Sequence, residues 1–190
     1  MDYTNTITKY LQEGIDARKA VDPKQVIEVS ERIHSAMKKG NKLILFGNGG
    51  SAADAQHIAG EFVCRFLIER RSMPAISLST DTSVLTAIGN DYGYDDVFAR
   101  QIEGLGKEGD VAIGLSTSGN SPNVIKGIRK AKSLGIYTIG FGGKDGGALK
   151  DEVDMMVIAK AGLHGQIQEV HITLGHMISM IVEDMMFGNR

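Results

Sequence analysis

Two segments of this 190-residue sequence have the composition of anion-binding loops. The first, Gly47-Asn48-Gly49-Gly50-Ser51, follows an apolar run and precedes a stretch of helical character. Glycine lets backbone amides approach a ligand closely, and the N-terminus of a helix favours an anion. An ordinary strand-to-helix turn is the simpler interpretation. The glycines, the helix start and the Ser51 hydroxyl together favour a phosphate site.

The second segment, Ser116-Thr117-Ser118-Gly119-Asn120-Ser121-Pro122-Asn123, also follows an apolar run and leads into a helical stretch. Pro122 suits the first turn of that helix. Ser121 is a natural N-cap, but capping does not explain the other three hydroxyls. Neutral hydroxyls and amides bind phosphate without lysine or arginine. We therefore expect both loops to face one crevice at the carboxyl ends of their strands.

Nucleotide binding is the alternative for the first loop. It is not a P-loop, because no Gly-Lys-Ser/Thr follows it. Residues 47–52 do match Gly-x-Gly-x-x-Ala, which occurs in dinucleotide-binding proteins. The ribose-binding acid is expected about 20 residues further on, whereas the candidate Asp81 lies 34 residues after Gly47. This spacing disfavours a nicotinamide or flavin site.

His57 and Glu61 lie four residues apart in the stretch after the first loop, so a helix places them on one face, and Arg65 continues that row. An imidazole and a carboxylate at this spacing can hold one metal ion or transfer protons. A solvated ion pair on a helix is the alternative interpretation.

The last helical stretch has an apolar stripe that is flanked or interrupted by Gln168, His171 and His176. A histidine beside such a stripe is more often part of the core than a ligand. The periodicity does not decide between His171 and His176.

Five short apolar runs predict buried strands, and helical periodicity lies between them. The strands are expected at 42–46, 75–78, 111–115, 136–141 and 155–158, and helices at about 52–65, 83–88, 95–105, 122–134 and 166–186. This alternation predicts an α/β fold with a parallel, doubly wound sheet. Two further helices are expected within residues 1–40. The sequence does not show whether the terminal helices pack on the sheet or on another subunit.

The composition is that of one globular domain, with 42% hydrophobic and 23% charged residues. A net charge of −2 gives no basic excess, which argues against nucleic acid and a membrane surface as partners. Cys64 is the single cysteine, so no internal disulfide is expected, in agreement with a reducing compartment. The sequence shows no signal-peptide pattern and no apolar stretch of membrane-spanning length, so we expect a cytoplasmic protein.

Taken together, these motifs resemble the phosphoheptose isomerases of the SIS-domain type, in order and spacing and over nearly the whole chain. The matching segments are 47–57, Glu61, Arg65, 90–93, 116–121 and 167–171. The resemblance implies one SIS domain over residues 1–190, with a five-stranded, flavodoxin-like, three-layer fold. It implies a homotetramer in whose packing residues 1–40 take part, with active sites between subunits. The implied reaction converts sedoheptulose 7-phosphate to D-glycero-D-manno-heptose 7-phosphate, for the nucleotide-activated heptose of surface glycans such as lipopolysaccharide.

The resemblance also implies roles for individual residues. Glu61 and His176 form the acid–base pair, and the ligands of a zinc ion are His57, Glu61, Gln168 and His176. The implied substrate contacts are Asn48, Gly49, Gly50, Ser51, Glu61, Arg65, Asn90, Asp91, Ser116, Thr117, Ser118, Ser121 and Gln168.

The ligand set raises a geometric question. Gln168 and His176 are eight residues apart, about 12 Å along a regular helix. Both can reach one ion only if Gln168 lies at the frayed start of that helix and the two side chains lean together. Nitrogen and oxygen donors without a thiolate also suit several divalent metals. Zinc is therefore implied by the resemblance and not by the donor set.

One segment departs from the family. Where members often have Ser-x-x-Thr-Ala-Arg, this chain has Ala161-Gly162-Leu163-His164-Gly165-Gln166. The missing arginine and hydroxyls leave the choice of phosphosugar open. The alternative functions are an isomerase of another phosphosugar, a sugar-phosphate-sensing SIS domain, and a non-catalytic SIS module of the replication-initiator-associated type. Such modules usually lack a carboxylate at the position of Glu61 and a histidine at the position of His176.

Overall fold

A computed structural model describes residues 3–188. Within this range, strands and helices alternate along the chain, and the strands form one parallel sheet in the order β2-β1-β3-β4-β5. The predicted doubly wound fold is therefore confirmed. The elements are α1 (Tyr3–Lys19), α2 (Pro23–Lys38), β1 (Leu43–Gly47), α3 (Gly50–Val63), β2 (Ala75–Ser77), α4 (Thr82–Asp91), η1 (Tyr94–Asp96), α5 (Val97–Leu105), β3 (Val111–Ser116), α6 (Pro122–Ser133), β4 (Tyr137–Gly143), η2 (Gly147–Asp151), β5 (Met155–Ala159) and α7 (His164–Phe187).

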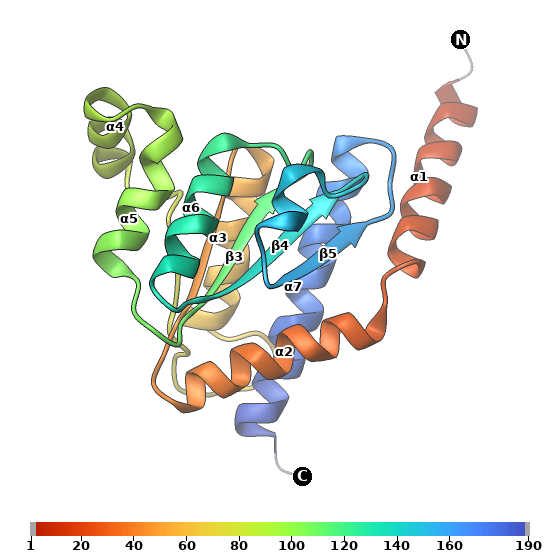
Figure 1. Cartoon of the computed structure of the whole chain (residues 1–190). Helices are drawn as coiled ribbons and strands as arrows, with labels where there is room; N and C mark the ends of the chain where they lie inside the picture. Colours follow the sequence, from red (N-terminus) through yellow and green to blue (C-terminus); the bar gives the residue numbers. More distant parts are fainter. Residues whose placement is uncertain (1–2, 189–190) are drawn as a thin grey trace.

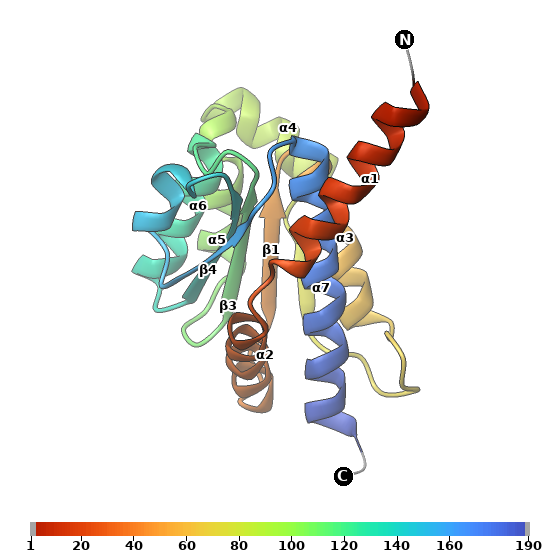
Figure 2. The ribbon, with the colours of Figure 1, turned by 90° about the vertical axis from the view of Figure 1, so that its right-hand side faces the viewer.

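The strands separate two apolar cores, because successive side chains point to opposite faces of a sheet. In β1, Leu43 and Leu45 pack among residues of α2, α3 and α7. Ile44 and Phe46 pack among residues of α5 and α6. The molecule therefore has three layers, with the sheet in the middle (Figure 1 and Figure 2). All five residues of β1 are buried, as expected for a central parallel strand.

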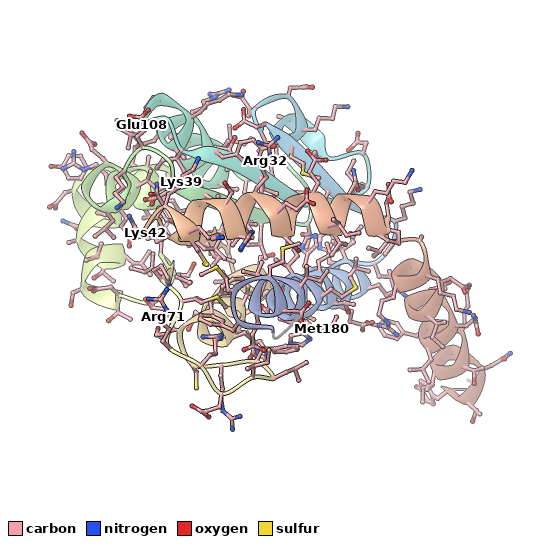
Figure 3. All side chains as sticks on the ribbon, turned by 90° about the horizontal axis from the view of Figure 1, so that it is seen from below. Arg32, Lys39, Lys42, Arg71, Glu108 and Met180 are labelled. Carbon is pink, nitrogen blue, oxygen red and sulfur yellow. The ribbon has the colours of Figure 1, made fainter. Side chains whose placement is uncertain are left out.

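Helix α2 crosses the base of the molecule, with α7 beside it, as the view from below shows (Figure 3). Its start is fixed by two residues: the Asp22 side chain accepts a hydrogen bond from the amide of Lys24, and Pro23 occupies the first turn. On its other side, the Arg32 guanidinium lies 4.9 Å from the centre of the Tyr137 ring, at the start of β4. This helix therefore closes the end of the sheet opposite to the two loops.

Helix α1 extends beyond the body of the protein (Figure 1 and Figure 2). Its apolar side chains Tyr3, Ile7, Leu11 and Ile15 are exposed, and Gly14 and Ala17 are its buried residues. The helix itself was predicted. Its packing on another subunit stays a prediction.

Two local predictions were wrong. Helix α3 ends at Val63, so Arg65 lies in the following loop and does not continue the row of His57 and Glu61. Helix α7 begins at His164, two residues earlier than expected, which places Gln168 one turn inside it. The short helix η2 was not predicted. Of the helices in residues 3–188, none has the length and apolar character needed to cross a membrane.

Candidate active site

The two predicted loops lie side by side. β1 and β3 are neighbours, with Gly47 paired to Leu115, and the chain turns from β1 to β2 on one side and to β3 on the other. Such a change of direction opens a crevice at the carboxyl ends of the two strands. Residues 47–51 and 116–121 are at this position, as the sequence predicted.

In the first loop, glycine is required by both conformation and space. Gly49 precedes α3 with φ 57° and ψ −121°, in the region that favours glycine. A Cβ on Gly50 would lie 2.3 Å from Nε2 of Gln168, so glycine allows the amide of α7 to reach the first turn of α3. Ser51 is only 4% exposed, beneath the end of β1. Its contact with substrate stays a prediction.

The side chain of Asn48 joins the two loops. Its Nδ2 donates to Oδ1 of Asn123 over 2.8 Å, and its Oδ1 accepts from Nδ2 of Asn123 over 2.9 Å. The Tyr94 hydroxyl donates to the same Asn48 oxygen over 3.2 Å. Asn123 is 2% exposed, and a buried amide at this depth is stable only when it is paired. Neither Asn123 nor Tyr94 was predicted as a site residue: Asn123 ends the second loop segment but has no hydroxyl, and Tyr94 has no periodic or motif signal.

The second loop is held by its own hydroxyls. Oγ of Ser116 lies 3.0 Å from Oγ of Ser121 and accepts from the amide of Gly119 over 3.1 Å. Oγ of Ser118 accepts from the amide of Asn120 over 3.2 Å. Ser121 occupies the predicted N-cap position of α6, but its hydroxyl bonds Ser116 and makes no capping hydrogen bond. Behind the loop, a Cβ on Gly119 would collide with the carbonyl of Gly146, so residues 143–147 support it closely.

Three predicted substrate contacts are exposed at the periphery. Asn90 and Asp91 end α4, where Nδ2 of Asn90 donates to Oδ1 of Asp91 over 2.7 Å. Nε of Arg65 lies 3.5 Å from Oε2 of the exposed Glu69. Their contact with substrate stays a prediction.

His57, Glu61 and His176 meet where α3 and α7 run side by side. The two helices are parallel, because Gln168 lies against Gly50 and Gly175 against Ile58. Nε2 of His57 is 3.0 Å from Oε1 of Glu61 and 3.0 Å from Nε2 of His176. The structure therefore brings both members of the predicted acid–base pair into one cluster. Gln168 contacts α3 two turns away from it, so a fourth ligand at Gln168 stays a prediction.

The donor atoms of this cluster suit a divalent cation. One atom from each of the three residues lies within 4.8 Å of the others. Nε2 of His57 faces both Glu61 and His176, although an imidazole nitrogen has a single in-plane direction for a hydrogen bond. Three donors that converge in this way can share one positive ion, and two imidazoles with a carboxylate form a common catalytic ligand set. The residues present therefore fit a metal ion.

His171 answers the question that the periodicity left open. It is fully buried against the sheet, with Nε2 3.1 Å from the carbonyl oxygen of Gly142. Burial lowers the pKa of the His171 imidazole to about 4, although the Gly142 carbonyl raises it in part. His171 is thus a neutral core residue, whereas His176 belongs to the cluster.

Asp54 is an acidic residue of α3 that we did not single out. It lies one turn before His57, and its Oδ2 is buried without a hydrogen-bond partner among the described residues. Burial raises the pKa of the Asp54 carboxyl to about 6, and the nearby His57 lowers it only in part.

Comparison with known proteins agrees with this geometry. The sequence model of the SIS domain family matches residues 2–143. A phosphoheptose isomerase from Roseiflexus is 48% identical over 188 residues, which cover 97% of this chain and 95% of that protein. One from Aquifex aeolicus is 55% identical over 161 residues, 85% and 84% of the two chains. The structure of a phosphoheptose isomerase from Neisseria gonorrhoeae matches with a TM-score of 0.90 and 35% identity, over 96% of this chain and 99% of that one.

The chain therefore belongs to the SIS domain family and, within it, to the phosphoheptose isomerases.

Proposed function

We propose that this protein converts sedoheptulose 7-phosphate to D-glycero-D-manno-heptose 7-phosphate. One observation supports this most directly: the carboxylate of Glu61 and the imidazole of His176 converge, through His57, at the seam between α3 and α7. The same helix α3 begins at the first anion loop. An acid–base pair and a phosphate site are thus connected by one short helix.

The reaction moves one proton between C1 and C2 of the sugar through an enediol. Glu61 and His176 act as the acid–base pair. One of them takes the proton from carbon and returns it to the neighbouring carbon, while the other exchanges a proton with the sugar oxygens. The loops at 47–51 and 116–121 hold the phosphate at the far end of the substrate. Fixing that end positions C1 and C2 against the pair.

The cofactor we propose is zinc, held by His57, Glu61 and His176, with Gln168 as the fourth ligand. A bound divalent ion polarises the oxygens of a substrate and stabilises negative charge that develops on them. The converging nitrogen and oxygen donors support a metal at this position.

We further propose a cytoplasmic homotetramer that supplies heptose for surface glycans. The exposed apolar residues of α1 support a role for this helix in packing against another subunit. The departure at 161–166 adjoins a hollow between α1 and the start of α7, lined among others by Tyr10, Glu13 and Leu163. That hollow supports a second candidate, an isomerase whose phosphosugar differs beyond C1 and C2.

One assay tests these functions together. Metal-loaded protein is incubated with sedoheptulose 7-phosphate, and the aldose is followed by NMR. We expect the aldose product to form, which excludes a non-catalytic binding module and a sensing domain. If no product forms but another ketose phosphate is converted, the second candidate replaces the first. If neither is converted by folded, metal-loaded protein, the proposed function is wrong.

A further inference from the structure

The loop after α3 takes its shape from one buried carboxylate on α7. The backbone amides of Phe66, Leu67 and Ile68 donate to the oxygens of Glu183 over 2.9, 2.6 and 2.9 Å. Figure 2 shows this segment beside the lower half of α7. Three consecutive amides on one carboxylate fix the backbone of the loop, because each of them would otherwise need a separate partner.

Arg70 completes the arrangement from within the loop. Its Nε donates to Oε1 of Glu183 over 2.8 Å, and both side chains are 1% exposed. A buried ion pair is stable only when its remaining donors are also satisfied. The other guanidinium nitrogens donate to backbone carbonyls at the end of α3 and in the loop, those of Glu61, Phe62, Cys64 and Arg71.

The charges of this pair are well compensated. Burial raises the pKa of the Glu183 carboxyl, but the three amides and Arg70 outweigh burial and hold the pKa below its usual range. Glu183 therefore stays ionised at neutral pH. The pair links the end of α3, where Glu61 lies, to the loop that follows it.

The loop places an aromatic ring against the cluster. The Phe66 ring stacks on the imidazole of His176, with ring centres 5.7 Å apart and an angle of 23° between the planes. The His57 ring contacts the same imidazole in a tilted arrangement, with ring centres 5.0 Å apart and an angle of 59° between the planes. His176 is thus in contact with both a fixed aromatic face and its partner in the cluster.

We propose that Phe66, anchored by the Arg70–Glu183 ion pair, is a positioning residue that holds the His176 imidazole in the orientation in which it binds a divalent cation. Groups that orient a ligand side chain commonly change metal affinity by about 10- to 100-fold when they are removed. Stacking restricts the tilt of an imidazole through its face and leaves both ring nitrogens free. The inference rests on the proposed function for its effect on turnover, but not for its effect on metal binding.

A space-filling role is the alternative for Phe66, and the replacement chosen can separate the two. Leucine fills a similar apolar volume but offers no flat face, whereas tyrosine keeps the ring. If Phe66 only fills space, leucine and tyrosine serve equally. If the ring orients His176, tyrosine preserves metal binding and leucine does not.

The test measures Co²⁺ binding to metal-free, full-length protein, by competition with a chromophoric chelator and by the visible absorption of bound Co²⁺. For Phe66→Leu we expect affinity to fall about 10-fold and the absorption band to change. Phe66→Tyr should retain the affinity and the band. Leu67→Ala is the matched control, because Leu67 is the exposed neighbour in the same loop, and it should bind as the unaltered protein does.

Turnover is measured on the same variants. We expect kcat of Phe66→Leu to fall about 10-fold at saturating metal while KM changes less than 2-fold, since the phosphate loops are untouched. Unaltered Co²⁺ affinity and band in Phe66→Leu would overturn the inference, as would a failure of the unaltered protein to bind Co²⁺. If Co²⁺ binding depends on Phe66 but no sugar phosphate is converted, the inference stands and the proposed function fails.

The anchor is tested separately with Glu183→Gln, which keeps the shape but weakens all three amide contacts. We expect amide hydrogen exchange at 66–68 to accelerate and Co²⁺ affinity to fall. Combined with Phe66→Leu, the two losses should be less than additive, because both act through one ring. Full additivity would overturn the role of the anchor. If the Glu183 variant does not fold, the Phe66 variants alone decide the proposal.

Discussion

The two ends of the candidate site are built in different ways. At the loop end, side chains are already paired with each other: Asn48 with Asn123, and Ser116 with Ser121. At the seam of α3 and α7, one nitrogen of His57 faces both Glu61 and His176, and all three side chains are accessible to solvent. The polar side chains of the loop end are thus paired with each other before a ligand binds, whereas the donor atoms of the seam converge on one place. This difference suggests that substrate binding and proton transfer can be damaged separately.

The largest effect is expected at the seam. Glu61→Gln and His176→Gln should each lower turnover by about 100-fold or more with the fold retained, because each removes one member of the proposed acid–base pair. Steady-state kinetics and circular dichroism measure the two properties. Glu31→Gln, on the exposed face of α2, is the control and should be fully active. Near-normal turnover in either seam variant refutes the role of that residue.

The second prediction concerns His171, which lies on α7 but outside the cluster at the seam, and its effect on stability at low pH. Because the pKa of buried His171 is about 4, its unfolded form binds a proton first as the pH falls below about 6.5. Stability is therefore lost on acidification, by about 2 kcal/mol between pH 7 and pH 5. Urea unfolding of the unaltered chain and of His171→Gln measures this. The variant should lose less stability than the unaltered chain between pH 7 and pH 5. An equal loss of stability in both proteins would show that His171 is not its source.

The third prediction concerns the loop end. Asn123→Ala removes both bonds to Asn48 and leaves the Tyr94 hydroxyl as the remaining partner of that amide, which should loosen the spacing of the two loops. We expect kcat/KM to fall about 10-fold, mainly through KM, because the phosphate is held less well. Ser133→Ala, at the exposed end of α6, is the control. A fall in kcat at constant KM would instead assign Asn123 to the chemistry and contradict the division between the two ends.

The smallest effect is expected at Asp54, on α3 between the two ends. With its pKa raised to about 6, the folded chain binds the proton more tightly, so stability falls as the pH rises from about 4 to 6. Asp54→Asn should be more stable than the unaltered chain at pH 7.5, by about 1 kcal/mol once solvent screening is allowed for. Thermal unfolding at pH 7.5 and pH 4 measures this difference, which should vanish at the lower pH. A difference that is equal at both values would point to packing instead of charge.

The features that could be predicted from the sequence are those set by local patterns. The strands, the two loops and the pair His57 and Glu61 follow from local patterns, namely short apolar runs, glycine spacing and helical periodicity. The choice of His176 over His171 does not, because it depends on which face of α7 meets α3. Arg65 was misplaced for a similar reason. Helix α3 ends at Val63, and a carboxylate more than 100 residues later in the chain fixes the backbone that follows.

Asn123 and Tyr94 show most clearly that long-range contacts could not be predicted from the sequence. Each bonds Asn48 through a contact that spans more than 40 residues of sequence. No periodicity connects such positions, so these contacts appear only once the sheet has brought the chain segments together.

The parallel docking of α7 along α3 also has a consequence for synthesis on the ribosome. His176 and Glu183 follow all five strands and both loops in the sequence, so the cluster of His57, Glu61 and His176 and the loop anchor are completed only after the whole sheet has been synthesised. A product terminated before His176 would have the loops at 47–51 and 116–121 but only one member of the proposed acid–base pair. It would also expose strand residues such as Leu45 and Phe141 that α7 helps to cover, which marks the fragment for aggregation or degradation.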